Sequence, residues 1–150
     1  MDRNILILED NEDRMRKFER AATLLGAFCL HFWRDAKRMI MECPPLLTNC
    51  SLISLDHDLN SESGAIEDPG TGLEVSEFLA RRKPICPIII HTSNTERRWS
   101  MHNEFRFGEW VIEIVPPIGE NWIQNSWLPK AKMLIESHPA NTSTLKTRQY

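Results

Sequence analysis

Acidic side chains follow two apolar runs of the sequence, at the points where ligand-binding residues lie in parallel α/β proteins. Glu9 and Asp10 end the first run, and Asp56, His57 and Asp58 end a later one. Carboxylates gathered in one place repel each other unless a cation neutralises them. A hard divalent cation with oxygen ligands, such as Mg²⁺, is the usual solution. The pattern therefore predicts a carboxylate cluster centred on Asp56 that binds Mg²⁺ and handles a phosphoryl group.

Each of these residues, taken alone, also has an ordinary structural explanation. A single Asp after a strand is usually a turn former or a helix cap, and the hydroxyl of Thr92 could cap the next helix. The occurrence of acids after two runs and a hydroxyl after a third favours a site. His91 is either a strand-end residue with satisfied hydrogen bonds or a member of the site. His57, between two Asp residues, is the stronger candidate for a proton carrier.

Five apolar runs alternate with segments of helical periodicity and must position these residues. The strands are predicted at residues 5–8, 28–33, 52–55, 88–90 and 110–115, and the helices at 12–25, 36–41, 71–79, 95–103 and 123–134. This alternation is typical of an α/β fold with a parallel sheet covered on both faces. Residues 60–70 are rich in Ser, Gly, Glu and Asp, which predicts a solvated loop.

Local signals refine the helices. Thr71 with Glu74 predicts a capping box, and Thr95 is predicted to cap the following helix. Pro129 predicts a bend in the last helix. Arg97 and Arg98 could steer a phosphate or form a solvated helix face. Aromatic residues at helical or strand spacing usually belong to the core, so a core position rather than a base-stacking surface is expected for Trp99, Trp110, Trp122 and Trp127.

The totals suit one globular domain. The chain has 150 residues, 41% hydrophobic and 26% charged, with a net charge of −3 that offers no general attraction to nucleic acid or anionic membranes. The four cysteines form no CxxC pair, so a zinc site is not expected. No apolar segment is long enough for a signal peptide or a membrane span. We therefore expect a cytoplasmic protein without a DNA-binding output domain and without a membrane partner.

Four segments resemble, in the correct order, parts of response-regulator receiver domains: ILILEDN, SLISLDHDL, GTGLEVSEFLA and PIIIHTSN. The resemblance implies a CheY/flavodoxin-like (βα)5 three-layer sandwich with a central five-stranded parallel sheet over residues 1–137, followed by a flexible tail at 138–150. The matches themselves run from about Ile5 to Thr95, and the tail is expected because the polar residues from His138 onward have no core-forming pattern. The resemblance implies that Glu9, Asp10 and Asp56 hold Mg²⁺ and that Asp56 accepts the phosphoryl group. The backbone carbonyl of Asp58 would complete the metal site, and Thr92 would contact phosphoryl oxygens.

One departure from ordinary receivers changes the expected function. Their fifth strand ends in Lys-Pro, whereas Pro116-Pro117 follows Val115 here and no Lys precedes it. His57 or His91 could supply the missing positive charge. The chain is most similar to the divergent cyclic-phosphate-processing receiver domains, which share the SLDHDL-like and HTSN-like segments and lack that Lys. This resemblance implies a role on cyclic phosphates, such as RNA 2′,3′-cyclic ends.

Two functional hypotheses follow, and a metal-binding scaffold without chemistry is a third. The first is an Mg²⁺-dependent phosphoesterase, with Asp56 as nucleophile or metal ligand and Asp58 or His57 as proton carrier. The alternative is a phospho-accepting or pseudo-receiver signalling module of the response-regulator type. The expected partner is a phosphate-containing small molecule or RNA end in the first case, and a signalling protein in the second. Since receivers often pair, a homodimer is also considered.

Overall fold

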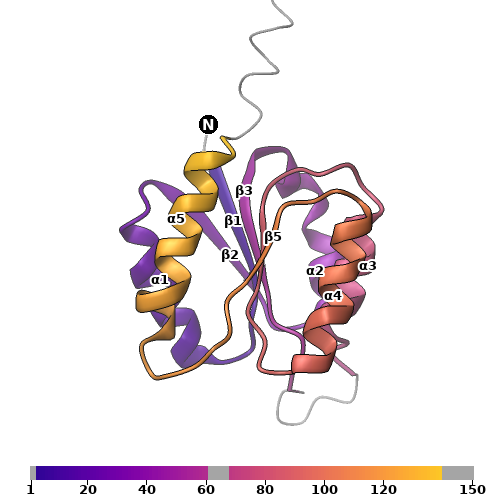
Figure 1. The fold of residues 1–150 in the computed structure, drawn as a ribbon, viewed down its shortest axis with the longest axis horizontal. Coiled ribbons are helices and arrows are strands. Elements are labelled where there is room, and N and C mark those ends of the chain that lie inside the picture. The colour runs from indigo at the N-terminus through magenta and orange to yellow at the C-terminus, as the bar shows by residue number, and fades with distance from the viewer. Residues whose placement is uncertain (1–2, 61–67, 140–150) are drawn as a thin grey trace, which may run out of the picture.

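A central parallel sheet lies between two layers of helices in the computed structural model, which describes residues 3–60 and 68–139 (Figure 1). The strand order is β2-β1-β3-β4-β5. The strands are β1 (Arg3–Leu8), β2 (Phe28–Trp33), β3 (Cys50–Leu55), β4 (Ile88–Ile90) and β5 (Ile112–Ile114). The α/β class and the five-stranded parallel sheet expected from the sequence are confirmed.

Helices cover both faces of this sheet, α1 and α5 on one side and α2, α3 and α4 on the other (Figure 1). The helices are α1 (Glu12–Thr23), α2 (Ala36–Glu42), the 3₁₀ helix η1 (Pro44–Asn49), α3 (Gly72–Ala80), α4 (Thr95–Phe107), the π-helical segment η2 (Ile123–Trp127) and α5 (Leu128–Ser137). None of those described is both long and apolar enough to cross a membrane.

The strand side chains alternate between two cores, because successive residues of a strand point to opposite faces. The core under α1 and α5 takes Ile5, Ile7, Leu52 and Ile89, and the core under α2, α3 and α4 takes Leu6, Leu8, Ile53, Leu55, Ile88 and Ile90. The same alternation continues past the strand ends. It assigns Glu9, Asp56 and His91 to the face covered by α1 and α5.

The fifth strand is shorter than the sequence predicts, and the first two residues of the predicted range lie between a turn and the strand. Glu109 has a positive φ of 64°, so the backbone turns there instead of extending. The Trp110 ring packs edge-on against Phe105, and its Nε1–H donates to the carbonyl of Arg82 at 3.2 Å. The strand therefore begins at Ile112, two residues after the buried Trp110.

Two predicted helix caps are wrong in detail. Asn94 is the N-cap of α4, where its side chain accepts the N–H of Arg97, so Thr95 is already the first helical residue. Thr71 is the N-cap of α3, but its side chain makes no capping hydrogen bond. Its backbone instead forms an isolated antiparallel bridge with Asp58. This bridge holds Thr71 extended beside the end of β3.

Other expectations have mixed outcomes. The irregularity of the last helix begins before Pro129, because the N–H of Leu128 donates to the carbonyl five residues back, at Ile123, in the π-helical pattern. Trp110, Trp122 and Trp127 are buried as expected. Trp99 is 52% exposed, so its predicted core position is wrong. Most of the predicted loop (61–67) and of the predicted tail (140–150) lies outside the described residues.

Candidate functional site

The candidate site lies at the carboxyl ends of β1, β3 and β4, which meet at one edge of the sheet. The sheet pairing continues one residue beyond these strands. The N–H of Asp56 donates to the carbonyl of Leu8 at 3.1 Å, and the N–H of His91 donates to that of Leu55 at 2.9 Å. The backbone of the two site residues is therefore held by the sheet and not by a loose loop.

Three side chains converge at this edge on the α1 and α5 side. One ligand atom each of Glu9, Asp56 and His91 lies within 4.8 Å of those of the other two. All three residues are buried, and Asp56 keeps 6% exposure. It is the one group of potential metal-ligating side chains found in the part of the chain that the structure describes.

His91 is fixed by hydrogen bonds at both ring nitrogens. Its Nε2–H donates to Glu9 Oε1 at 3.1 Å, and its Nδ1 lies 2.7 Å from Ser54 Oγ. Because the Ser54 oxygen already accepts the indole N–H of Trp127 at 3.0 Å, the hydroxyl can donate its proton to Nδ1. Both ring nitrogens of His91 thus have a hydrogen-bond partner. His91 therefore has satisfied hydrogen bonds at a strand end and also orients Glu9.

Arg14 is the cation of the site, and the sequence reasoning missed it. Its guanidinium Nη1 lies 3.6 Å from Glu9 Oε1 and 3.8 Å from Asp56 Oδ2, and the group sits 5.4 Å from the ring centroid of Trp122. Arg14 is in the first turn of α1, whose N-cap is Asn11. A basic residue one turn after an acid pair was the available signal. Arg14 therefore brings positive charge within 4 Å of both carboxylates.

The two carboxyl groups have pKa values displaced in opposite directions. Burial, and the negative charge of Glu9, raise the pKa of Asp56 to about 6, against the influence of His91, Arg14 and the His57 N–H. Burial also raises the pKa of Glu9, but the hydrogen bond and charge of His91, with Arg14, outweigh it and the net pKa is lowered. Near neutral pH the pair has one firmly ionised member and one that can exchange a proton.

Asp10 lies outside this group. Its Oδ2 accepts the backbone N–H of Asn60 at 2.6 Å, so it ties the start of α1 to the segment after β3. By the alternation of β1, its side chain leaves the strand toward the face opposite Glu9. Its predicted role as a metal ligand stays a prediction.

His57 and Asp58 form a pair at the outer side of the site. His57 Nδ1 lies 2.7 Å from Asp58 Oδ1, and Asp58 Oδ2 accepts the amide N–H of Asn94 at 3.3 Å. The Asp58 side chain is 63% exposed, whereas His57 is buried. Partial burial raises the pKa of Asp58, but these hydrogen bonds and the charge of Arg97 lower it overall. Asp58 is therefore ionised near neutral pH.

Thr92 is buried at the end of β4, beside the same edge. Its hydroxyl oxygen accepts the backbone N–H of Asn94 at 3.1 Å, and its carbonyl accepts an N–H of Arg98 at 2.9 Å. Another buried nitrogen of Arg98, Nε, has no hydrogen-bond partner among the described residues. The proton of the Thr92 hydroxyl is left for a further acceptor, which is what a contact to a phosphoryl oxygen requires.

Gly72 fits against the backbone of the site. Its N–H donates to the carbonyl of His57 at 3.0 Å, and a Cβ on Gly72 would overlap the carbonyl oxygen of Asp56. The first turn of α3 therefore approaches the end of β3 as closely as two backbones can. The second glycine of the GTG segment is thus required by this close approach and not by an unusual φ.

The donor set fits a hard divalent cation. Glu9 and Asp56 offer carboxylate oxygens close to each other, and oxygen is the ligand that Mg²⁺ prefers. His91 turns a protonated nitrogen toward Glu9 and so offers no lone pair there. A site with two protein oxygens leaves positions for water and phosphate, as Mg²⁺ sites usually do. An imidazole that gave up its proton would favour Mn²⁺ or a similar transition metal.

Comparison with known proteins agrees with this geometry. Residues 5–107 match a family model described as the cyclic-phosphate processing receiver domain. Among solved structures, the chain is similar to the receiver domain of an HD domain-containing protein from Pseudomonas fluorescens (16% identity, TM-score 0.63, 91% of this chain and 99% of that one). It is also similar to the receiver domain of HemR from Leptospira biflexa (16%, 0.66, 89% and 94%) and the response regulator domain of Thermotoga maritima CheB (14%, 0.63, 91% and 98%). None of the curated proteins matches the chain.

Proposed function

The chain belongs to the cyclic-phosphate processing receiver domain family, and from this membership we propose that it is a metal-dependent phosphoesterase that opens cyclic phosphates at Asp56. The observation that carries the proposal is the buried group of Glu9, Asp56 and His91, with Arg14 in ion-pair range of both carboxylates. Two carboxylates with opposite pKa displacements and a nearby cation suit attack on a phosphoryl group.

Glu9 and Asp56 would hold the cation, and the resemblance to receivers adds Asp10. A bound divalent cation would neutralise charge on the phosphoryl oxygens and align them for attack. Arg14 contributes a second positive charge from the α1 side. His91 keeps the Glu9 carboxylate in place through a 3.1 Å hydrogen bond from inside the core. The metal would therefore bind to a carboxylate that is already oriented.

Asp56 acts as the nucleophile. One of its oxygens forms a bond to phosphorus, and a ring P–O bond breaks with its electron pair on the departing oxygen. That oxygen takes a proton from His57 in its imidazolium form, whose Nδ1 lies 2.7 Å from Asp58 Oδ1. Water then attacks the phosphorus, Asp58 accepts the water proton, and the bond between Asp56 and phosphorus breaks. The product is a phosphomonoester, with Thr92 donating to a phosphoryl oxygen.

We expect the protein to hydrolyse at least one member of a panel of cyclic nucleotides and 2′,3′-cyclic RNA ends when Mg²⁺ or Mn²⁺ is present. Asp56→Asn should lower the rate by at least about 1,000-fold, because the amide is a poor nucleophile and a weaker metal ligand. Phosphomonoester product is measured by chromatography, with and without EDTA.

The matched control is Asp13→Asn, which makes the same chemical change at an exposed carboxylate of α1. This variant should keep the wild-type rate. The proposal is contradicted if the wild type hydrolyses every member of the panel no faster than Asp56→Asn does, with either metal.

A second candidate function has its own supporting observation. Asp56 lies at the end of β3 in the same fold as phospho-accepting receivers, and its Oδ1 is held at 2.7 Å by the backbone N–H of His57, which leaves Oδ2 toward Arg14. This arrangement suits a lasting phosphoryl group on Asp56 in a signalling module.

Incubation with acetyl phosphate and Mg²⁺ distinguishes the two candidates. The phosphoesterase reading predicts that the intact mass of the protein does not change at steady state, because the group is passed to water. The signalling reading predicts addition of one phosphate, absent in Asp56→Asn. A lasting phosphate on the wild type, together with no turnover of the panel, would replace the first proposal by the second.

A further inference from the structure

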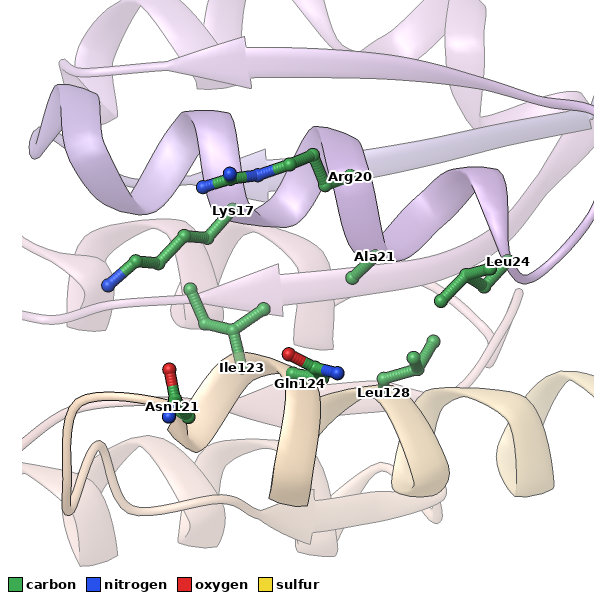
Figure 2. A pocket seen from close by; sticks show the side chains of 8 residues that line it. All are labelled: Lys17, Arg20, Ala21, Leu24, Asn121, Ile123, Gln124 and Leu128. Atoms are coloured by element: carbon green, nitrogen blue, oxygen red, sulfur yellow. The ribbon is translucent and has the colours of Figure 1, made fainter.

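A groove of about 300 Å³ runs between α1 and the segment that contains η2 and the start of α5. In Figure 2 the side chains of Lys17, Asn121 and Ile123 turn into the space between the two walls, and that of Arg20 lies along α1. One wall has Lys17 and Arg20 of α1 and its C-cap residue Leu24. The opposite wall has Asn121, Gln124 and Leu128. This volume lies at the lower end of the range of small-molecule sites.

The groove is polar at one end and apolar at the other. Lys17 and Asn121 lie at one end of the view, and Leu24 and Leu128 approach each other at the other end (Figure 2). The Lys17 ammonium spans the polar end, where it donates to the carbonyl of Glu120 at 3.3 Å. The groove therefore offers positive charge and apolar surface in a fixed order along α1.

Two polar side chains of the groove have no polar partner among the residues that the structure describes. Neither Arg20 nor Gln124 uses its side chain in a hydrogen bond or an ion pair with the residues that the structure describes. The guanidinium is a donor fork for anions, and the amide can both donate and accept. η2 forms this wall, and π-helical turns in other proteins are frequent at functional sites.

The polar end of the groove adjoins the candidate site. Lys17 lies one helical turn after Arg14 on α1, which places their Cα atoms about 5 Å apart along the helix axis. On the other wall, Asn121 and Ile123 flank Trp122, the ring on which the Arg14 guanidinium lies. A ligand whose phosphoryl group reaches Asp56 past Arg14 has the groove beside it for the rest of its structure.

We infer that this groove binds the nucleoside part of a nucleotide substrate, with the reacting phosphate toward Arg14 and Lys17 and the base toward Leu24 and Leu128. The inference rests on the proposed function for the identity of the reacting group. A base presents apolar faces to leucines and polar edges to the Gln124 amide. Arg20 is placed to contact a ribose hydroxyl or a second phosphate. A simple sugar phosphate would leave the apolar end unused.

The test measures binding in EDTA by NMR titration, with adenosine 2′,3′-cyclic phosphate and inorganic phosphate as separate probes. Leu24→Asn should weaken binding of the nucleotide about fivefold and leave binding of inorganic phosphate unchanged, because the side chain is 69% exposed and supports no core. Arg20→Gln should weaken the nucleotide about tenfold. Perturbed amide signals should map to α1 and η2.

Matched controls make the same changes elsewhere. Met41→Asn alters an exposed apolar side chain of α2, on the other face of the sheet, and Arg16→Gln removes an exposed cation of α1 outside the groove lining. Both should bind the nucleotide as the wild type does. Equal effects of Leu24→Asn and Met41→Asn, or of Arg20→Gln and Arg16→Gln, would overturn the inference.

Turnover separates this inference from the proposed function. With metal present, the wild type should have a higher kcat/KM for adenosine 2′,3′-cyclic phosphate than for glycerol 1,2-cyclic phosphate, and Leu24→Asn should reduce that preference. Equal kcat/KM values for the two compounds would overturn the inference about the groove but would not contradict the proposed phosphoesterase function. If the nucleotide binds in the groove but neither compound is hydrolysed, the inference about the groove is supported and the proposed phosphoesterase function is contradicted.

Discussion

Gly72→Ala is expected to destabilise the fold by about 3 kcal/mol and to remove the function of Asp56 in the molecules that remain folded. The added methyl group would overlap the carbonyl oxygen of Asp56 and crowd the backbone of His57. Neither neighbour is a flexible side chain that can move aside. The end of β3 or the first turn of α3 must therefore shift, and the carboxylate of Asp56 shifts with it.

Urea denaturation measures the loss of stability, and turnover under folding conditions measures the loss of function. Gly119→Ala is the control, because a Cβ there meets nothing within 4 Å and the cost is limited to its positive φ of 88°. That cost is about 1 kcal/mol. A Gly72→Ala protein with the stability and activity of the wild type would show that the two backbones are not in close contact.

Asp56→Asn is expected to stabilise the metal-free protein at pH 8 by up to about 3 kcal/mol, while it abolishes activity. The pKa of Asp56 is raised from 3.8 to about 6, first by burial and then by Glu9. Folding therefore works against ionisation of this carboxyl. A neutral amide of the same shape avoids that penalty and still accepts the N–H of His57.

The sign of the pH dependence follows from the proton count. Between about pH 4 and pH 6, the folded state holds the proton of Asp56 while the unfolded state has released it, so unfolding free energy falls as the pH rises. Above about pH 6 both states are ionised and the penalty is constant. The advantage of Asp56→Asn should thus be small near pH 4 and should reach its maximum by about pH 7.

Urea titrations of both proteins in EDTA at several pH values check this expectation. Asp13→Asn is again the control, because its carboxylate is exposed and should give no such pH-dependent gain. Added Mg²⁺ or Mn²⁺ should stabilise the wild type and not Asp56→Asn. A stability difference between wild type and Asp56→Asn that does not change from pH 4 to pH 8 would show that burial of the charge is not the cause.

The parallel sheet could be predicted because its strands are short apolar runs buried on both faces. Ile88–Ile90 is the clearest example, since three consecutive isoleucines contact cores on both sides. Boundaries were less predictable. Tryptophan is frequent in strands, so Trp110 was predicted to belong to one. Its ring is buried against Phe105 because the chain turns at Glu109. A tertiary contact, and not strand preference, decides where β5 begins.

For the candidate site, the order of the sequence determined that Glu9 and Asp56 would meet, because both follow strands that end at the same edge. The two-residue period of strands could also have placed His91 with them, since Ile89, two residues earlier, points to the same face as Ile7 and Leu52. The same period separates Asp10 from Glu9. The period therefore predicts which side chains share a face, while the role of Asp10 as a metal ligand stays a prediction.

The sequence by itself thus determined the fold class and the central acids, because strand burial and strand order are local properties of the chain. Only the tertiary structure decided their electrostatics. Burial raises the pKa of Asp56 to about 6, and Arg14 of α1 lies 3.8 Å from its carboxylate. Ser54 and Trp127, 73 residues apart, fix the ring of His91. These contacts depend on how the helices pack on the sheet, and the contact of Ser54 with Trp127 has no signal in the spacing of residues along the chain.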